Sequence, residues 1–266
     1  MSLGIVIKGP EGLVLAAESR ITLTADYGKS QIPVNFDNAT KLLSFSNPNC
    51  AVGAVTYGLA AIGLRAAHSF IPEFESELPE ERLKIEDFAN RLSEFFLNQW
   101  EKEMHSDYSG PPMTFVVSGF DEDEPYGKVY LFEIPNKPTP EPRNPGEADF
   151  GITWGGQHEF VNRLLMGYDP TLIQYLEDKN LINQELDSLI KSLQMNIPLA
   201  AMALQDCVDL ALFFIRTTIN GQKLTVGIRG CGGPIDVATI TRNEGLKFIQ
   251  QKNVHGETKD GRNRYE

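Results

Sequence analysis

The first residue that could do chemistry is Ser2, which directly follows the initiator methionine. Methionine aminopeptidase removes a methionine that precedes a small residue, and its action here would give Ser2 a free α-amine. The ordinary pKa of an α-amine is about 7.7–8.0, so the group can accept a proton near neutral pH. Ser2 would then hold both a nucleophilic hydroxyl and its general base, as an N-terminal threonine does. Serine is also common at position 2 without any catalytic role, so the rest of the sequence must indicate whether Ser2 is a nucleophile.

Other reactive side chains are few and scattered along the chain. The cysteines, which are odd in number and form no CxxC pair, are Cys50, Cys207 and Cys231. The histidines, which show no ligand spacing such as HExxH, are His68, His105, His158 and His255. The cysteines are expected to be reduced thiols in an intracellular compartment, and the histidines surface or capping residues. We therefore expect no metal site and no cofactor.

Composition and charge exclude several classes of protein. The chain has 266 residues, of which 41% are hydrophobic, so it can bury a sizeable core. Its net charge of −12 argues against binding to nucleic acid or to an anionic membrane, because both partners require a basic surface. No apolar run reaches the ~18 residues of a membrane-spanning helix, and the start lacks the features of a signal peptide. A cytoplasmic location is expected.

The elements that must position Ser2 follow from the hydrophobic pattern. Short β-type runs predict strands over 3–8, 13–17, 41–46, 51–57, 113–120, 128–134, 150–156, 224–230, 234–241 and 246–251. Apolar residues at three- and four-residue spacing predict helices over 58–78, 79–104, 157–167, 170–178, 183–194 and 198–219. Residues 18–40 are expected to be a long polar connection. The proline-rich stretch 135–149 is expected to be a surface loop, with a domain linker as the alternative.

The order of these elements indicates the fold. Strands and helices occur in segregated runs, which is typical of α+β proteins and not of βαβ winding. The helix over 198–219 is apolar almost all round, as expected for a helix between other layers. We therefore predict a four-layer αββα sandwich, with two sheets face to face and helices outside both. It would form a single domain over 1–252, and the polar residues 253–266 would be a flexible tail.

The N-terminal third resembles a known family. Ser2 lies ten residues before Gly12, which opens GLVLAA, and Glu18-Ser19-Arg20 follows without a gap. Lys41 in NATKLLSF and Gly58 at the end of GAVTYG complete the pattern, and weaker likeness continues in TWGG and GGPIDVATITRNEG. This pattern resembles the proteasome-type subunits of the N-terminal-nucleophile (Ntn) hydrolases, in particular the bacterial or archaeal β type, in which a threonine starts the first strand. The αββα sandwich is the fold of that family.

The resemblance implies a role for each matching residue. Ser2 would be the nucleophile, and Lys41 would place a positive charge beside its Oγ and α-amine. Glu18 would hold Lys41 charged through a buried ion pair, so each would need the other. The backbone N–H of Gly58, at the start of the helix expected there, would stabilise the oxyanion.

The resemblance also implies a substrate and partners. Ile21, Thr56 and Ala60 match positions that line the family's first specificity pocket, which suggests a modest apolar preference. The substrate would be a peptide or an unfolded protein. The partners would be further copies of the chain in a ring or stacked homo-oligomer, with outer helices in contact, and an ATP-dependent unfoldase.

The sequence departs from the family at positions that bear on activity. Serine replaces threonine, and Glu18 replaces the usual aspartate. Gly155 stands where a serine is usual, with Thr153 two residues away; Thr217, next to Thr218, replaces an aspartate. Two alternatives to a peptidase therefore remain open. One is a non-catalytic scaffold or assembly subunit, and the other is an Ntn amidohydrolase that acts on a small amide.

Overall fold

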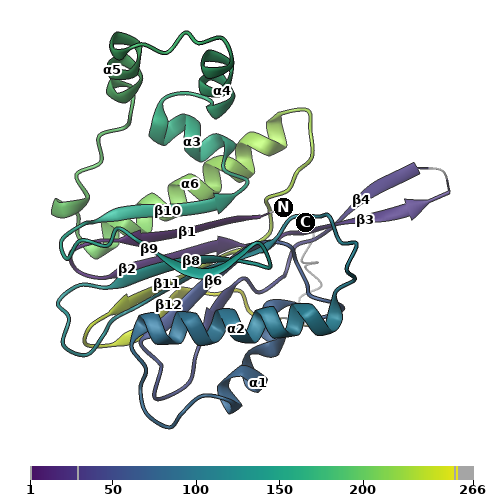
Figure 1. Cartoon of the computed structure of the whole chain (residues 1–266), viewed down its shortest axis with the longest axis vertical. Coiled ribbons are helices and arrows are strands. Elements are labelled where there is room, and N and C mark those ends of the chain that lie inside the picture. Colours follow the sequence, from purple (N-terminus) through teal and green to yellow (C-terminus); the bar gives the residue numbers. More distant parts are fainter. Residues whose placement is uncertain (1, 29, 255, 257–266) are drawn as a thin grey trace.

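Antiparallel sheets with separate helices make up the computed structural model of the chain (Figure 1), which describes residues 2–28, 30–254 and 256. Six α-helices and three antiparallel sheets are found among these residues. This arrangement agrees with the predicted α+β class. Most of the tail expected at 253–266 lies outside the described residues.

The first sheet positions both Ser2 and Glu18. Its strands run in the order β10-β1-β2-β11-β12. Their bounds are β1 Leu3–Lys8, β2 Leu13–Glu18, β10 Gly151–Gly156, β11 Ile235–Thr241 and β12 Gly245–Gln250. The predicted hairpin of β1 and β2 is confirmed. Its last paired residues are Gly4 and Ala17, so the residues just beyond them lie together at the open end.

The second sheet carries Lys41 at one end. Its strands run in the order β5-β6-β7-β8-β9. Their bounds are β5 Leu42–Ser44, β6 Val52–Gly58, β7 Met113–Gly119, β8 Lys128–Ile134 and β9 Lys137–Arg143. The loop expected over 135–149 was wrong, because β9 pairs with β8. Its prolines occupy alternate positions on an edge strand, so their missing N–H groups face away from the ladder.

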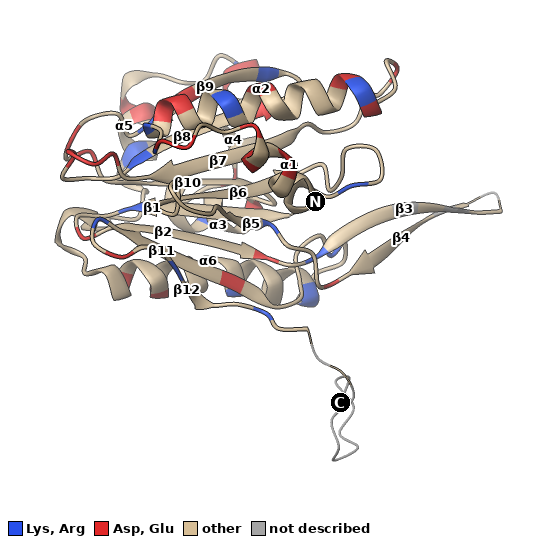
Figure 2. Cartoon of the chain, turned by 90° about the horizontal axis from the view of Figure 1, so that it is seen from below, with Lys and Arg blue, Asp and Glu red and all other residues tan. Residues whose placement is uncertain are grey.

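A third, two-stranded sheet replaces the polar connection that was expected over 18–40. It consists of β3 Ile21–Tyr27 and β4 Ser30–Phe36, which pair along their whole length. Figures 1 and 2 show that this ribbon projects away from the rest of the molecule. The expectation failed because apolar residues alternate with polar ones here, and the average composition is polar although the period is that of a strand.

Helices cover the outer face of each large sheet (Figure 2). The helices packed on the second sheet are α1 Ile71–Ser76, preceded by a 3-10 turn over Ala67–Phe70, and α2 Ile85–Glu103. The helices packed on the first sheet are α3 Glu159–Met166 and α6 Leu204–Leu224. Between the sheets lies an apolar layer that includes Val6, Leu15, Val55 and Val116.

Two short helices stand apart from these layers. They are α4 Pro170–Asp178 and α5 Gln184–Ser192, and Figure 1 shows them at the top of the molecule. A 3-10 turn over Leu199–Ala201 then leads toward α6.

Two further expectations from the sequence were wrong. The helix expected over 58–78 is helical only from Ala67 to Ser76, because Gly58 ends β6 and turns follow it. The strand expected over 224–230 is absent from these described residues, since α6 continues to Leu224 and no neighbouring strand is there to pair with Val226 and Ile228. Over the described residues, no helix is both long and apolar enough to cross a membrane.

Candidate active site

Glu18 is the centre of the candidate site, at the open end of the β1–β2 hairpin. Its side chain is fully buried. Its carboxylate accepts hydrogen bonds from the backbone N–H groups of Leu3 at 3.2 Å, Arg20 at 2.7 Å and Gly232 at 2.9 Å. The carboxylate therefore takes the place that a backbone carbonyl would hold in a continued ladder. Three backbone donors stabilise the charged form of a buried carboxylate.

Lys41 brings a positive charge to the same point from the second sheet. Its ammonium donates to Glu18 Oε1 and to the carbonyl oxygen of Arg20, and both side chains of the ion pair are buried. The Lys41 carbonyl accepts from Thr56 N–H at 2.9 Å, which fixes the backbone beside β5. Burial lowers the pKa of Lys41, and the nearby Glu18 charge opposes that shift. The structure thus brings Glu18 and Lys41 together.

Ser2 directly precedes β1, and the N–H of the next residue, Leu3, donates to Glu18. Ser2 is 6% exposed, and its carbonyl accepts from Gln157 N–H at 2.6 Å. Alternation along the strand places Ser2 on the same face as Gly4, and a Cβ on Gly4 would lie 2.5 Å from Val55 of β6. The side of β1 that carries Ser2 therefore faces the second sheet. The expected removal of Met1 concerns a residue outside the described part of the chain.

A chain of hydrogen bonds connects Ser2 to Glu18 through two glutamines that sequence reasoning missed. Gln157 Oε1 accepts from Gln222 Nε2 at 2.8 Å, and Gln222 Oε1 accepts from the N–H of Cys231 at 2.9 Å. The N–H of the next residue, Gly232, donates to Glu18. The only sequence signal was a polar residue on the otherwise apolar side of a long helix.

The turn over 230–233 packs against an ion pair next to the site. Arg20 Nε and Nη2 donate to the two carboxylate oxygens of Asp37 at 2.6 and 2.7 Å. These bonds lower the pKa of Asp37. A Cβ on Gly232 would lie 2.4 Å from Arg20, and one on Gly233 would lie 2.3 Å from the Asp37 carbonyl oxygen. Only glycines allow this close approach.

Cys231 sits inside that turn as a buried thiol. Burial raises its pKa, and the Glu18 charge raises it further. A thiol with a raised pKa is a poor nucleophile. Cys231 is therefore a packing residue.

Gly58 ends β6, and the expectation that it starts a helix was wrong. Its φ is +87°, and a Cβ at this position would lie 2.2 Å from the Pro112 carbonyl oxygen, so only glycine fits. Thr56 N–H points to Lys41, and Leu59 N–H points to Pro112 on the opposite side. Alternation therefore directs the Gly58 N–H toward the side of β5 and Lys41. Because β6 ends at Gly58 and no helix starts there, no helix dipole strengthens the interaction of the Gly58 N–H with an oxyanion.

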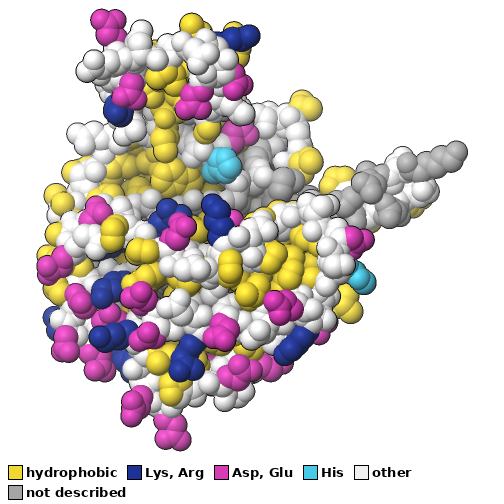
Figure 3. All heavy atoms as spheres, viewed as in Figure 1, with side chains coloured by type: hydrophobic (Ala, Val, Ile, Leu, Met, Phe, Trp, Pro, Cys, Tyr) yellow, Lys and Arg dark blue, Asp and Glu magenta, His cyan; other side chains and the backbone are white. Residues whose placement is uncertain are grey.

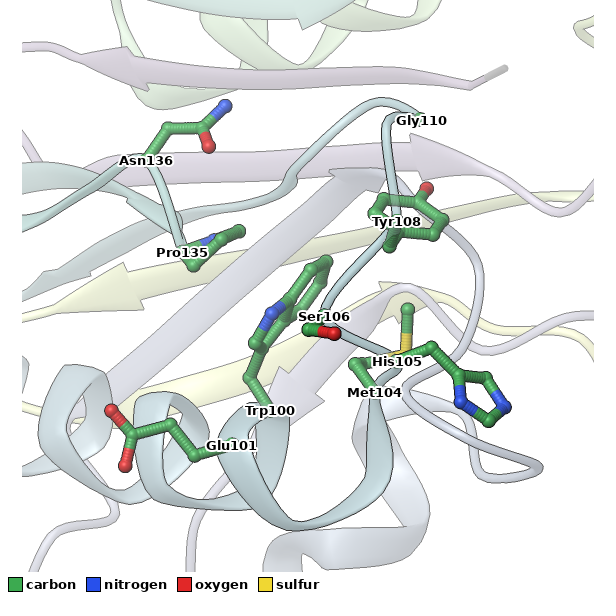
Figure 4. A pocket seen from close by; sticks show the side chains of 9 residues that line it. All are labelled: Trp100, Glu101, Met104, His105, Ser106, Tyr108, Gly110, Pro135 and Asn136. Carbon is green, nitrogen blue, oxygen red and sulfur yellow. The ribbon is translucent and has the colours of Figure 1, made fainter.

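The residues expected to bind substrate are spread around this end of the molecule. Thr56 is buried, and its hydroxyl has no hydrogen-bond partner among the described residues. Ile21 and Ala60 are half-buried. A hollow of about 350 Å³, seen in Figure 4, is lined by none of these three residues and lies beside Trp100 and Tyr108 at the end of α2.

Thr217 and Thr218, which lie where the resembled family has an aspartate, form no hydrogen bond with Glu18 or Lys41 in the described structure. Thr217 lines a surface hollow on α6 together with Asp209 and Arg216. The Thr218 hydroxyl donates to the Phe214 carbonyl at 2.9 Å within the same helix. A Cβ on Gly155 would lie 2.3 Å from the Tyr57 hydroxyl, so the Tyr57 ring fills the space of a side chain there.

The buried Lys41–Glu18 ion pair thus lies at the start of β1, where Glu18 accepts from the N–H of Leu3, the residue after Ser2. Within the described residues, no group of three His, Cys, Asp or Glu side chains could hold a metal ion. No model of a known protein family matches the chain, and no curated protein matches it either.

Proposed function

We propose that the chain is an N-terminal-nucleophile hydrolase with the four-layer sandwich of proteasome-type subunits. The observation that carries the proposal is the buried ion pair of Glu18 and Lys41 at the start of β1, beside Ser2. A lysine held in this position from the opposite sheet is what activation of an N-terminal hydroxyl requires. The helices outside both large sheets support the same conclusion.

The proposed reaction is acyl transfer to Ser2 after removal of Met1. The α-amine of Ser2 takes the hydroxyl proton, and Oγ attacks the carbonyl carbon of the substrate amide. Lys41 stabilises the developing negative charge on Oγ, and the Gly58 N–H donates to the oxyanion. The C–N bond then breaks, and the α-amine gives its proton to the leaving amine. Water hydrolyses the ester by the same route and restores Ser2.

The burial of Lys41 beside Glu18 fits this role. A cation that is partly desolvated is not screened by water, so its field at the hydroxyl is stronger than that of a surface lysine. Glu18 keeps the ammonium in place, while its own charge is balanced by three backbone donors. Every step of the proposed reaction is carried by groups of this chain and by water.

The substrate and assembly follow from the family resemblance alone. We propose peptide or unfolded-protein substrates, with Ile21, Thr56 and Ala60 beside the residue at the cleaved bond. A ring or stacked homo-oligomer in the cytoplasm, supplied by an ATP-dependent unfoldase, is the matching assembly.

A non-catalytic scaffold is the second candidate, and one observation favours it. Ser2 is only 6% exposed, and a buried hydroxyl is not open to a substrate. A buried Glu18–Lys41 pair can also serve to join the two sheets without any chemistry.

Labelling by a peptide epoxyketone or a β-lactone separates these functions. The proposal predicts one adduct on Ser2, located by peptide mass spectrometry and absent from Ser2→Ala. Ser188→Ala, a change at an exposed helical serine, should be labelled as the wild type. If a folded protein that begins at Ser2 forms no adduct, the result would support the non-catalytic scaffold instead. Turnover of small amides but not of peptides would instead indicate an amidohydrolase.

A further inference from the structure

The ribbon of β3 and β4 has one apolar face that nothing in the described chain covers. In the register of the two strands, Leu23 lies opposite Val34 and Ala25 opposite Ile32. Side chains alternate between the faces of a ribbon, so these residues share one face with Tyr27 and Phe36. Leu23, Tyr27, Ile32 and Phe36 are 42% to 76% exposed. The other face carries the hydrogen bond between Thr22 and Asn35.

Such a ribbon is not expected to be stable without a partner. An isolated two-stranded hairpin is marginal in water, and this one projects beyond both large sheets (Figures 1 and 2). Its base is nevertheless fixed, since Arg20 and Asp37 form a two-bond ion pair just before and just after the strands. The ribbon is therefore held out from the body with its apolar face exposed.

The same chain carries a second uncovered apolar surface on α4, α5 and the segment that follows them, which we call the helical platform. Helix α4 buries none of its residues, and α5 buries Ile190 alone. Helices of nine residues depend on tertiary packing for stability. Figure 3 shows hydrophobic side chains gathered between these upper helices and running down toward the first sheet. The exposed ones include Leu172, Tyr175, Leu181, Leu189, Leu193 and Met195.

We propose that the ribbon of one molecule docks by its apolar face on the helical platform of a second copy of this chain. A single head-to-tail contact of this kind covers both surfaces, whereas pairing of two ribbons about a two-fold axis would leave both platforms bare. A head-to-tail contact repeats from copy to copy, so it builds either a closed ring or an open filament. This proposal is independent of the chemistry at Ser2.

The size of the contact sets its strength. A strand of seven residues is about 24 Å long, and two strands are about 10 Å wide. That face is smaller than one side of a standard interface of about 800 Å², so a single contact should be weak and concentration-dependent. The net charge of −12 on each copy opposes association. Salt screens that repulsion, so the assembly should grow stronger as salt is added.

Sedimentation velocity of the full chain over a wide range of concentration tests the proposal. The wild type should form species larger than a monomer. Leu23→Thr with Ile32→Thr removes the ribbon anchors and places β-branched residues, which suit a strand, at both positions; it should weaken association by more than about a hundredfold. Asn35→Thr on the other ribbon face and Leu64→Thr at an exposed site elsewhere are controls that should assemble normally.

A mixing experiment identifies the head-to-tail geometry. Leu172→Gln with Leu189→Gln should also abolish assembly, through loss of the platform. When this variant is mixed with the ribbon variant, one intact ribbon meets one intact platform, so the mixture should stop at dimers. A monomeric wild type at high salt, a platform variant that still assembles, or two folded variants that do not combine would each overturn the proposal.

Discussion

Replacing Glu18 by glutamine tests the ion pair at the core of the site. The change keeps the size of the side chain but leaves the Lys41 ammonium buried without a counter-charge. Removing one partner of a buried pair destabilises a protein by about 3–5 kcal/mol. The glutamine amide also places an NH₂ group against backbone donors that the carboxylate had accepted.

Replacing Lys41 by methionine should be less harmful, and the contacts give the reason. Glu18 would keep three backbone donors, so its charge stays partly compensated. We expect a loss of about 1–3 kcal/mol in the free energy of unfolding. In the double variant no uncompensated ammonium remains. Its loss should therefore fall below the sum of the two single losses by about 2 kcal/mol.

Urea denaturation at neutral pH, followed by tryptophan fluorescence, measures these losses. Trp154 lies on β10 beside β1, so it reports on the first sheet. Extrapolation to zero urea gives each free energy of unfolding. Additive losses, or a Glu18→Gln variant within about 1 kcal/mol of the wild type, would show that Glu18 and Lys41 are not coupled and would refute the reasoning.

Three other changes probe the first sheet and the hydrogen bonds beside it. Gly156→Ala should destabilise the protein by more than about 2 kcal/mol in thermal denaturation, because its Cβ would lie 1.8 Å from the Ser2 carbonyl oxygen at a φ of +89°; an unchanged melting temperature would contradict this. Gln222→Leu leaves Gln157 Oε1 without its donor and should lower the free energy of unfolding in urea by about 1–3 kcal/mol; a smaller loss would mean that the network is not needed. Burial lowers the pKa of Lys8, so the unfolded chain binds more protons between that pKa and 10.5, and stability should rise with pH there. Lys8→Met should lack that part of the rise. If urea denaturation gave the same pH dependence of the free energy of unfolding for Lys8→Met and the wild type, the prediction would be contradicted.

The sequence was a good guide to the hairpin that brings residue 3 next to Glu18. Each strand of that hairpin is an apolar run that ends in one charged residue; the two are joined by a short turn with two glycines, and both are fully buried. The contact between Glu18 and Lys41 spans two sheets, and no local pattern predicts it. It was expected only because the order of motifs resembled a family.

The supporting network could not be predicted, because it depends on contacts between distant segments. Gln157 and Gln222 meet only when α6 packs on the first sheet. The pair of Arg20 and Asp37 frames a ribbon that was taken for a polar connection. Two expectations failed for the same reason, namely the loop over 135–149 and the strand over 224–230. Whether a segment forms a strand depends on the neighbouring strands and not only on its own composition.

The central claim is that Ser2 is the N-terminal residue and uses its own amine as a base. Intact-mass measurement of the protein, expressed without an N-terminal tag, tests this most directly. The account predicts the mass of a chain that begins at Ser2, lighter than the full sequence by one methionine. A chain that retains Met1 has no free amine at Ser2 and would contradict the proposed reaction.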